Sequence, residues 1–208
     1  MFASDSEGEG SVVVGRISFV KSCVIDYFLL VKPWIIGLVL VSTLAGIFIA
    51  EGGMPPFGLV AGTLVGIGLA TAAAASLNNY IDHDIDARMA RTSKRPTASG
   101  AIAPVKALAC GAGLTVASLV IMTYTTTELA AWLTGVSIFF YVIPYTLLMK
   151  RRTPLATFVG GIGGALPPVI GYAAAVPALD EKAFALFLVI YAWQHPHFWA
   201  LALKYRRL

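Results

Sequence analysis

Charged residues are scarce in this sequence. Lys, Arg, Asp and Glu make up 12% of its 208 residues, whereas 58% are hydrophobic. Because a water-soluble domain carries about 25% charged residues, this composition excludes an ordinary soluble fold. Long apolar runs at such a low charge density predict an all-α fold, a polytopic bundle of transmembrane helices embedded in the lipid bilayer.

Cysteine is also nearly absent. Cys23 and Cys110 are isolated and lack metal-binding spacing, which indicates buried thiols without a chemical role. The acidic start MFASDSEGEG has neither the basic region nor the apolar core of a cleaved signal peptide. Residues 1–12 are predicted to be disordered, within an N-terminal cytoplasmic tail that covers residues 1–26.

Six stretches are apolar enough to cross a membrane, for which about 20 residues are needed. They are 28–49, 57–81, 103–123, 129–148, 155–176 and 183–203. If all six stretches cross, both ends of the chain and the second and fourth gaps lie on the same side of the membrane. Of the 15 Lys and Arg residues, 14 belong to that side and only Lys182 to the other. The positive-inside rule places that side in the cytoplasm. The net charge of +4 therefore reflects membrane topology and predicts no nucleic-acid partner.

The costly charged groups concentrate in NNYIDHDIDARMARTSKRP, residues 78–96. Asn78, Asp82 and Asp86 recur every four residues and share one helix face, at about 100° per residue, while Asp84 points away. Carboxylates so close together repel one another, and Mg²⁺ would relieve that repulsion. Four cations follow: Arg88, Arg91, Lys94 and Arg95. Because arginine matches phosphate oxygens, the segment predicts a site for a metal-bridged diphosphate.

A second interpretation stays open for this segment. Charged loops at membrane interfaces are common, and their side chains pair with each other and with lipid headgroups. The alignment of Asn78, Asp82 and Asp86 favours the site over such a solvated loop, but spacing does not decide between the two.

The segment NNYIDHDIDARMARTSKRPTASG resembles the first aspartate-rich motif of the UbiA-type intramembrane prenyltransferases. Within that superfamily the chain is most similar to the protoheme IX farnesyltransferases, or heme O synthases. The stretches LVKP at 30–33, GGIGGALPPVIGYAA at 160–174 and WQHPHFWALALKY at 193–205 carry the same resemblance. It predicts a transmembrane prenyltransferase domain over residues 27–208.

The resemblance implies an enzyme that transfers a farnesyl group from farnesyl diphosphate to a vinyl group of heme B. The product would be heme O, in the heme A and cytochrome oxidase pathway. It implies that Asp82, Asp86 and Asn78 are catalytic and hold Mg²⁺ through the diphosphate. Arg91, Arg95, Lys94 and Lys32 would bind the diphosphate. Heme A synthase or oxidase assembly proteins are implied as partners, and a prokaryotic plasma membrane with a cytoplasmic N-terminus as the location.

Three polar or irregular places inside the spans each have two interpretations. His197 and His195 flank Pro196 and are heme candidates, with His197 preferred, but either histidine could serve packing. Gly160, Gly161, Gly163 and Gly164 permit close helix packing, and Pro167 and Pro168 are expected to break the helix. This segment either serves packing alone or forms the wall of a cavity for a flat porphyrin or a prenyl chain. Lys32 is either an anion contact or a lysine that reaches the interface along its aliphatic stem.

The resemblance also predicts a second aspartate motif, which this sequence lacks. Proteins of this kind have a second aspartate motif, and no aspartate follows Asp180 here. The chain is thus expected to be C-terminally truncated and inactive by itself. Alternatives are a UbiA-type enzyme for an aromatic quinone or chlorophyll precursor, an inactive fragment or scaffold, and a transporter, which the position of the motif near one membrane face disfavours.

Overall fold

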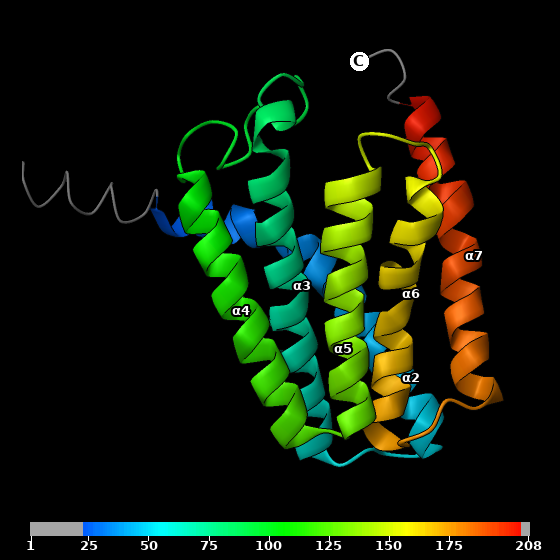
Figure 1. The fold of residues 1–208 in the computed structure, drawn as a ribbon. Coiled ribbons are helices and arrows are strands. Elements are labelled where there is room, and N and C mark those ends of the chain that lie inside the picture. The colour runs from blue at the N-terminus through cyan, green and yellow to red at the C-terminus, as the bar shows by residue number, and fades with distance from the viewer. Residues whose placement is uncertain (1–22, 205–208) are drawn as a thin grey trace, which may run out of the picture.

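The computed structural model describes residues 23–204, and the regular structure in that range is entirely helical (Figure 1). After a helical segment at residues 23–31, the elements are α2 (Pro33–Glu51), α3 (Phe57–Asp86), α4 (Pro104–Thr125), α5 (Glu128–Phe140), the π-helix η1 (Tyr141–Met149), α6 (Ala156–Ala175) and α7 (Glu181–Lys204). The predicted all-α bundle is confirmed. The predicted disordered tail, residues 1–12, lies outside the described residues.

The helices run antiparallel to their chain neighbours and pack closely through small residues. The most extensive interface joins α3 and α4, while α6 lies centrally against α2, α5 and α7. At the crossing of α2 and α6, a β-carbon on Gly46 would collide with the backbone of Pro168, and one on Gly171 with the backbone of Thr43. Glycine is therefore required at both positions for the two helices to approach this closely.

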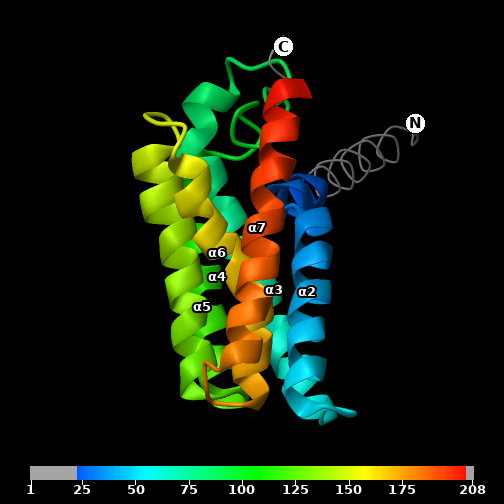
Figure 2. The same cartoon turned by 90° about the vertical axis from the view of Figure 1, so that its right-hand side faces the viewer.

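Five helical stretches are long and apolar enough to cross a membrane. They are Pro33–Glu51, Phe57–Asp86, Pro104–Thr125, Glu128–Met149 and Ala156–Ala175. The sixth predicted span forms α7, which has 24 residues and runs beside α6 and α2 (Figure 2) but is not among the five. Its C-terminal half carries Gln194, His195 and His197, whose polar side chains lower the mean hydropathy of the helix. The chain is a multi-pass membrane protein.

The prediction that Pro167 and Pro168 break α6 is wrong. The helix continues from Ala156 to Ala175 with both prolines inside it. Pro167 has no amide hydrogen to donate to the carbonyl of Gly163, four residues earlier. The hydroxyl of Ser137, on α5, donates to that carbonyl oxygen instead, at 3.0 Å. A neighbouring helix thus satisfies the group that the proline leaves unpaired.

The fourth predicted span, 129–148, forms two kinds of helix. It begins as α5 and widens at Tyr141 into η1, a π-helix that contains Pro144. The amide of Lys150 donates to the carbonyl of Tyr145 at 2.8 Å, and the hydroxyl of Thr146 to the carbonyl of Tyr141 at 2.7 Å. The backbone bond of Lys150 spans five residues, so the wider turn continues to the end of η1.

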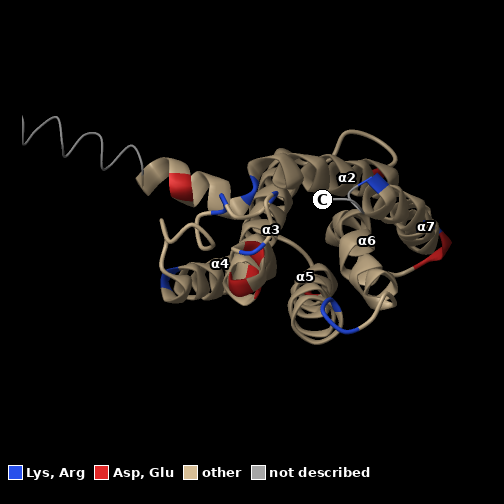
Figure 3. Cartoon of the chain, turned by 90° about the horizontal axis from the view of Figure 1, so that it is seen from above, with Lys and Arg blue, Asp and Glu red and all other residues tan. Residues whose placement is uncertain are grey.

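Most of the described charged side chains gather at one end of the bundle. Seen along the bundle axis, the acidic end of α3 lies among Lys and Arg from the flanking segments (Figure 3). The loop between α3 and α4, the loop after η1 and the start of α2 all lie at this end (Figure 1). We define the charged cluster as the side chains that are linked to one another at the end of α3: Lys32, Asn78, Asp82, Asp84, Asp86, Arg95, Lys150 and Arg151.

Candidate functional site

The last two turns of α3 carry the acidic motif. The helix extends to Asp86, five residues beyond the predicted end of the span at residue 81. Asn78, Asp82 and Asp86 are buried, with exposures of 2%, 3% and 4%, whereas the side chain of Asp84 is 46% exposed. The predicted separation onto two faces of one helix is therefore confirmed.

Asp82 and Asp86 are each neutralised by a cation from another part of the chain. The Lys150 ammonium nitrogen donates to Asp82 Oδ2 at 2.5 Å, and the Asn78 amide donates to the same oxygen at 2.8 Å. Arg95 donates to Asp86 Oδ2, also at 2.5 Å. Because buried charges are costly unless they are paired, these contacts explain how two carboxylates can be buried one turn apart.

Lys32 extends the same network from the start of α2. Its ammonium donates to Asn78 Oδ1 at 2.9 Å. Its backbone has φ 56° and ψ 65°, a left-handed conformation that a residue other than glycine rarely adopts. Burial, and then the charges of Arg95 and Lys150, lower the pKa of Lys32 to about 8. An uncommon backbone conformation and a shifted pKa both mark Lys32, which is partly buried, as a candidate functional residue.

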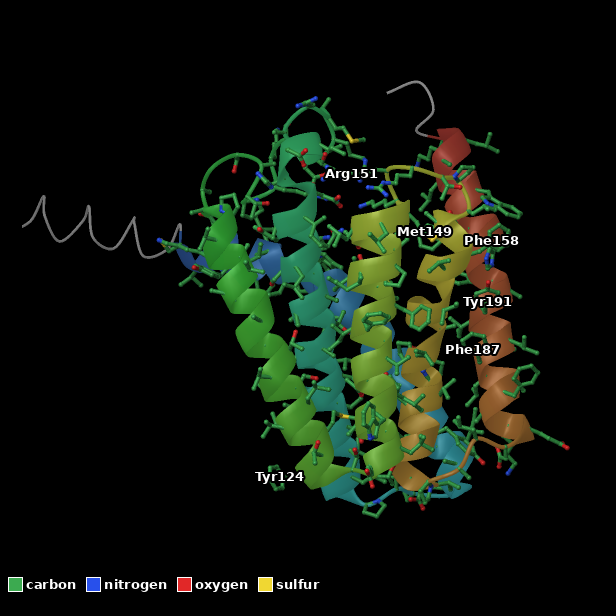
Figure 4. All side chains as sticks on the ribbon, viewed as in Figure 1. Tyr124, Met149, Arg151, Phe158, Phe187 and Tyr191 are labelled. Atoms are coloured by element: carbon green, nitrogen blue, oxygen red, sulfur yellow. The ribbon has the colours of Figure 1, made fainter. Side chains whose placement is uncertain are left out.

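Arg151 fastens the loop after η1 to the outer side of α3 (Figure 4). Its guanidinium donates to both carboxylate oxygens of Asp84, at 2.7 and 3.1 Å, and to the carbonyl of Ile81 at 2.5 Å. The hydrogen bond to Asp84 raises the pKa of Arg151. Because Lys150 is the preceding residue, this attachment also places Lys150 over Asp82.

Two buried threonines hold the loop between α3 and α4 in place. The hydroxyl of Thr92 donates to the carbonyl of Asp86 at 3.1 Å, and that of Thr97 to the carbonyl of Asn79 at 3.0 Å. Folding the loop back on the end of α3 brings Arg95 to Asp86. Arg91 and Lys94, the other predicted diphosphate contacts on this loop, are exposed to solvent.

The sequence interpretation missed Lys150 and Arg151 as members of the site. They lie 68 and 67 residues from the aspartates they contact, Asp82 and Asp84. One signal was available, because their loop was predicted to share the membrane side of the motif. Charge pattern places them on that side but cannot select them from the other cations there.

The predicted metal ligands can be tested against the donor set. Within residues 23–204, no three His, Cys, Asp or Glu side chains form a group that could hold a metal ion. Two buried carboxylates and the Asn78 amide oxygen nevertheless suit Mg²⁺, which typically binds one or two carboxylates and completes its shell with water and substrate phosphates. The residues therefore fit an ion that is shared with a diphosphate, rather than one held by protein alone.

The two histidines of α7 lie in different surroundings. His195 is 7% exposed, and its Nδ1 lies 2.7 Å from the carbonyl oxygen of Tyr191. Nδ1 must carry the proton to donate there, which leaves a lone pair on Nε2. Nε2 is buried and has no hydrogen-bond partner among the described residues. His197 is exposed on the outside of the bundle, stacked on Trp193 with ring centroids 5.0 Å apart.

Aromatic rings surround His195 between α6 and α7. The ring centroids of Phe158 and Tyr191 each lie 4.6 Å from that of His195, and that of Trp199 lies 6.0 Å away. Phe158 and Tyr191 project between the two helices below the level of Arg151 (Figure 4). A β-carbon on Gly161 would touch Tyr191 and His195, so this glycine leaves room for the rings.

The other predicted glycines also serve helix packing. Gly160 faces Tyr145, Gly163 faces the backbone of η1 at Tyr141, and Gly164 faces Gln194. A separate apolar groove of about 340 Å³ runs between α2 and α7, with Pro168 of α6 at its floor. The groove reaches Ile49 and Lys182 and so lies toward the end of the bundle opposite the charged cluster.

Comparison with known proteins identifies the family. The family model described as UbiA prenyltransferase family matches residues 39–207, most of the chain. The chain belongs to the UbiA prenyltransferase family. This confirms the resemblance that was inferred from the aspartate motif. The acidic face of α3 and its cations therefore form part of a UbiA-type bundle.

Similar proteins of this family are known from several bacteria. The protoheme IX farnesyltransferase of Aquifex aeolicus is 50% identical over 190 residues, which cover 91% of this chain and 65% of that protein. The protein of the same name from Salinispora tropica is 43% identical over 197 residues, 95% of this chain and 62% of the relative. The chain thus spans somewhat less than two thirds of the length of these relatives.

One solved structure shares the fold. It comes from work on digeranylgeranylglyceryl phosphate synthase in membranes and superimposes with a TM-score of 0.71 at 19% identity. The match covers 81% of this chain and 58% of that one. At this identity the likeness concerns the helical arrangement alone, and it supports the UbiA-type bundle described above.

Proposed function

We propose that the protein takes part in the transfer of a farnesyl group from farnesyl diphosphate to a vinyl group of heme B, which gives heme O. Membership of the UbiA family supports a prenyltransferase. The names of the most similar relatives support farnesyl and protoheme IX as the two substrates. The observation that carries the proposal is the pairing of two buried aspartates with Lys150 and Arg95 at one end of the bundle.

The reaction begins at the allylic carbon of the diphosphate. The C–O bond breaks, pyrophosphate leaves with the electron pair, and an allylic farnesyl cation remains. The vinyl group of heme attacks this cation and forms a carbon–carbon bond, which leaves a carbocation beside the porphyrin ring. Water adds there and loses a proton, giving the hydroxyethylfarnesyl group. An enclosed site is needed to keep water from the first cation.

The cations of the charged cluster suit the leaving group. Pyrophosphate gains negative charge as the C–O bond breaks, and preorganised donors stabilise that charge more strongly than they stabilise the intact substrate. Lys150, Arg95 and Lys32 are already directed to one place on α3. Arg91 and Lys94 lie on the same loop as Arg95 and would contact the outer oxygens of the diphosphate.

Asp82, Asp86 and Asn78 would hold Mg²⁺ together with the diphosphate. When bound, the ion neutralises charge on the phosphate oxygens as the leaving group departs. The protein contributes the two carboxylates, one turn apart on a rigid helix, and the amide oxygen beside them. Asp84 does not belong to this set, because it faces the outside and pairs with Arg151.

His195 is the better heme candidate of the two histidines. The tautomer set by the Tyr191 carbonyl leaves Nε2 as an acceptor within a cluster of aromatic rings. Phe158, Tyr191 and Trp199 offer flat apolar surfaces of the kind that suit a porphyrin. His197, which the sequence favoured, faces outward. Heme iron could reach the Nε2 lone pair only after one of the covering rings moves.

A bacterial plasma membrane is the proposed location, since the most similar relatives are bacterial. The charged cluster and the N-terminus would face the cytoplasm, where the positive-inside rule places the basic end. Farnesyl diphosphate would then enter from the cytoplasm and heme B from the bilayer. Heme A synthase or oxidase assembly proteins remain the proposed partners, because they would use the product.

Substrate binding and product formation test this proposal. Purified protein in detergent is titrated with farnesyl thiodiphosphate in the presence of Mg²⁺ and separately with heme B, whose Soret band reports binding. Membranes that contain the protein are incubated with farnesyl diphosphate and heme B, and hemes are analysed by liquid chromatography and mass spectrometry. Binding of both heme B and farnesyl thiodiphosphate supports the proposal, and heme O formation would extend it to the whole reaction. Farnesylation of an aromatic quinone precursor, without heme binding, would instead favour another UbiA activity.

A further inference from the structure

One oxygen of each proposed metal ligand already accepts a hydrogen bond from a cation. Lys32 donates to Asn78 Oδ1 at 2.9 Å. Lys150 donates to Asp82 Oδ2 and Arg95 to Asp86 Oδ2, both at 2.5 Å. A metal ion that binds these three oxygens would compete with the ammonium and guanidinium groups for them. Binding of the metal and release of the cations are therefore linked by the geometry of the site.

The charges of the site disfavour binding of the metal alone and of the diphosphate alone. Asp82 and Asp86 are two anions, and Lys32, Lys150 and Arg95 are three cations around them. A fourth cation, Arg151, lies 3.6 Å from Asp82 Oδ1 but is held by its closer pair with Asp84. A divalent ion by itself would leave three cations unpaired beside it in a partly buried place. A diphosphate by itself would find the cations engaged and would meet two carboxylates. Each ligand alone raises an imbalance that the other removes.

We infer that Lys150, Arg95 and Lys32 exchange partners when a metal-bound diphosphate arrives, so that metal and diphosphate bind as a coupled pair. In the state described here they neutralise the acidic face of α3. In the ligand-bound state Asp82 and Asp86 would hold the metal, and Lys150, Arg95 and Lys32 would pair with the phosphate oxygens instead. This inference rests on the proposed diphosphate site and concerns how that site is loaded.

The side chains that must move are suited to it. Lys32 and Lys150 have compact ammonium groups on flexible four-carbon stems, so a small rotation changes the partner without moving the backbone. Lys150 lies at the end of η1, and its side chain is 35% exposed. The carboxylates, by contrast, are on a continuous helix and are almost fully buried. The acidic face stays in place while the cations change partner.

Coupling predicts opposite effects of one substitution. Lys150→Met removes the cation that competes for Asp82 but keeps a side chain of similar length. Affinity for Mn²⁺ alone, used as a metal probe and followed by loss of the free-ion EPR signal, should rise about fivefold or more. Affinity for inorganic pyrophosphate in the presence of excess Mg²⁺, followed by calorimetry, should fall about tenfold, because a phosphate contact is lost.

Two matched variants control this experiment. Lys150→Arg keeps the charge and should return metal-only binding to the level of the unaltered protein. Arg152→Met removes an exposed cation from the same loop and should change neither affinity. If Lys150→Met does not fold, as judged by its thermal melting in detergent, Arg95→Met makes the same test at Asp86, where the same opposite changes are expected.

The outcomes separate this inference from the proposed function. If the unaltered protein binds pyrophosphate with Mg²⁺, but Lys150→Met leaves Mn²⁺ affinity unchanged or lowers it, partner exchange is wrong and the diphosphate site stands. If the unaltered protein binds no pyrophosphate at all in the presence of Mg²⁺, the diphosphate site is wrong and the exchange with it. Because pyrophosphate also binds Mg²⁺ in solution, partner exchange is judged from the metal-only titration, and the diphosphate site from the pyrophosphate titration.

Discussion

The ammonium nitrogen of Lys150 lies 2.5 Å from Oδ2 of Asp82, although 68 residues separate them in the chain. This contact joins the end of the π-helix to the acidic face of α3. Lys150 reaches it because η1 widens the helix from Tyr141 to Met149 and Arg151 fastens the following loop to Asp84. The pair therefore depends on α3, η1 and the loop after η1 packing together.

The buried and exposed aspartates should differ in what they contribute. Asp82→Ala and Asp86→Ala should each abolish binding of pyrophosphate with Mg²⁺, because each removes a proposed metal ligand. Each should also lower the free energy of unfolding by about 3 kcal/mol or more, since a cation is left without its buried partner. Asp84→Ala removes an exposed pair and should cost about 1 kcal/mol or less. Calorimetry and thermal melting measure the two effects, and equal losses at all three positions would contradict the assignment of faces.

Stability should depend on pH through Lys32. Burial lowers its pKa from 10.5 to about 8 in the folded protein, so between these values the unfolded state binds more protons than the folded state. The free energy of unfolding should therefore rise as pH increases from about 8 to about 10.5, and the penalty of the buried charge should be fully present below pH 8. Thermal melting in detergent measures this rise. Lys32→Met should lack it, and an identical pH profile in the variant would argue against a buried charged lysine.

The two histidines of α7 should respond differently. His195→Ala should weaken heme B binding, measured by Soret titration, because Nε2 is the acceptor within the aromatic cluster. His197→Ala should leave heme binding close to normal, since this ring is exposed and stacked on Trp193. Pyrophosphate binding should be unaffected in both variants. A parallel loss of heme and pyrophosphate binding in His195→Ala would indicate a packing role.

Ser137 should matter for stability rather than for binding. Its hydroxyl satisfies the Gly163 carbonyl that Pro167 leaves without a helical donor. Ser137→Ala should lower the free energy of unfolding by about 1–3 kcal/mol, the cost of a buried polar group without a partner. Thr123→Ala is the matched control, because its hydroxyl bonds to the carbonyl of Leu119 in an exposed place. If Thr123→Ala lowers the melting temperature as much as Ser137→Ala does, this explanation is wrong.

The orientation of the bundle can be tested by labelling. With Cys23 and Cys110 replaced by serine, single cysteines at positions 52 and 126 should react with a membrane-impermeant reagent from outside. A single cysteine at position 100 should react only from the cytoplasmic side, because its loop belongs to the basic end. Labelling at position 126 from the cytoplasmic side alone would contradict the proposed topology.

The sequence by itself determined the class of protein and the position of the acidic motif. Low charge and long apolar runs predict transmembrane helices, because a helix satisfies its backbone hydrogen-bonding groups within one segment where lipid offers no partners. Spacing by four residues placed Asn78, Asp82 and Asp86 on one face, since helix geometry is local. The same geometry correctly predicted that Asp84 lies on a different face of the helix.

Only the tertiary structure decided what meets that face. Lys150 and Arg151 come from a distant loop, and Lys32 from before α2, so no local periodicity relates them to Asp82. The continuity of α6 depended on Ser137 of another helix, and the burial of His195 rather than His197 depended on which side of α7 packs on α6. Helix periodicity specifies which residues share a face, but the packing of helices against each other specifies what that face contacts.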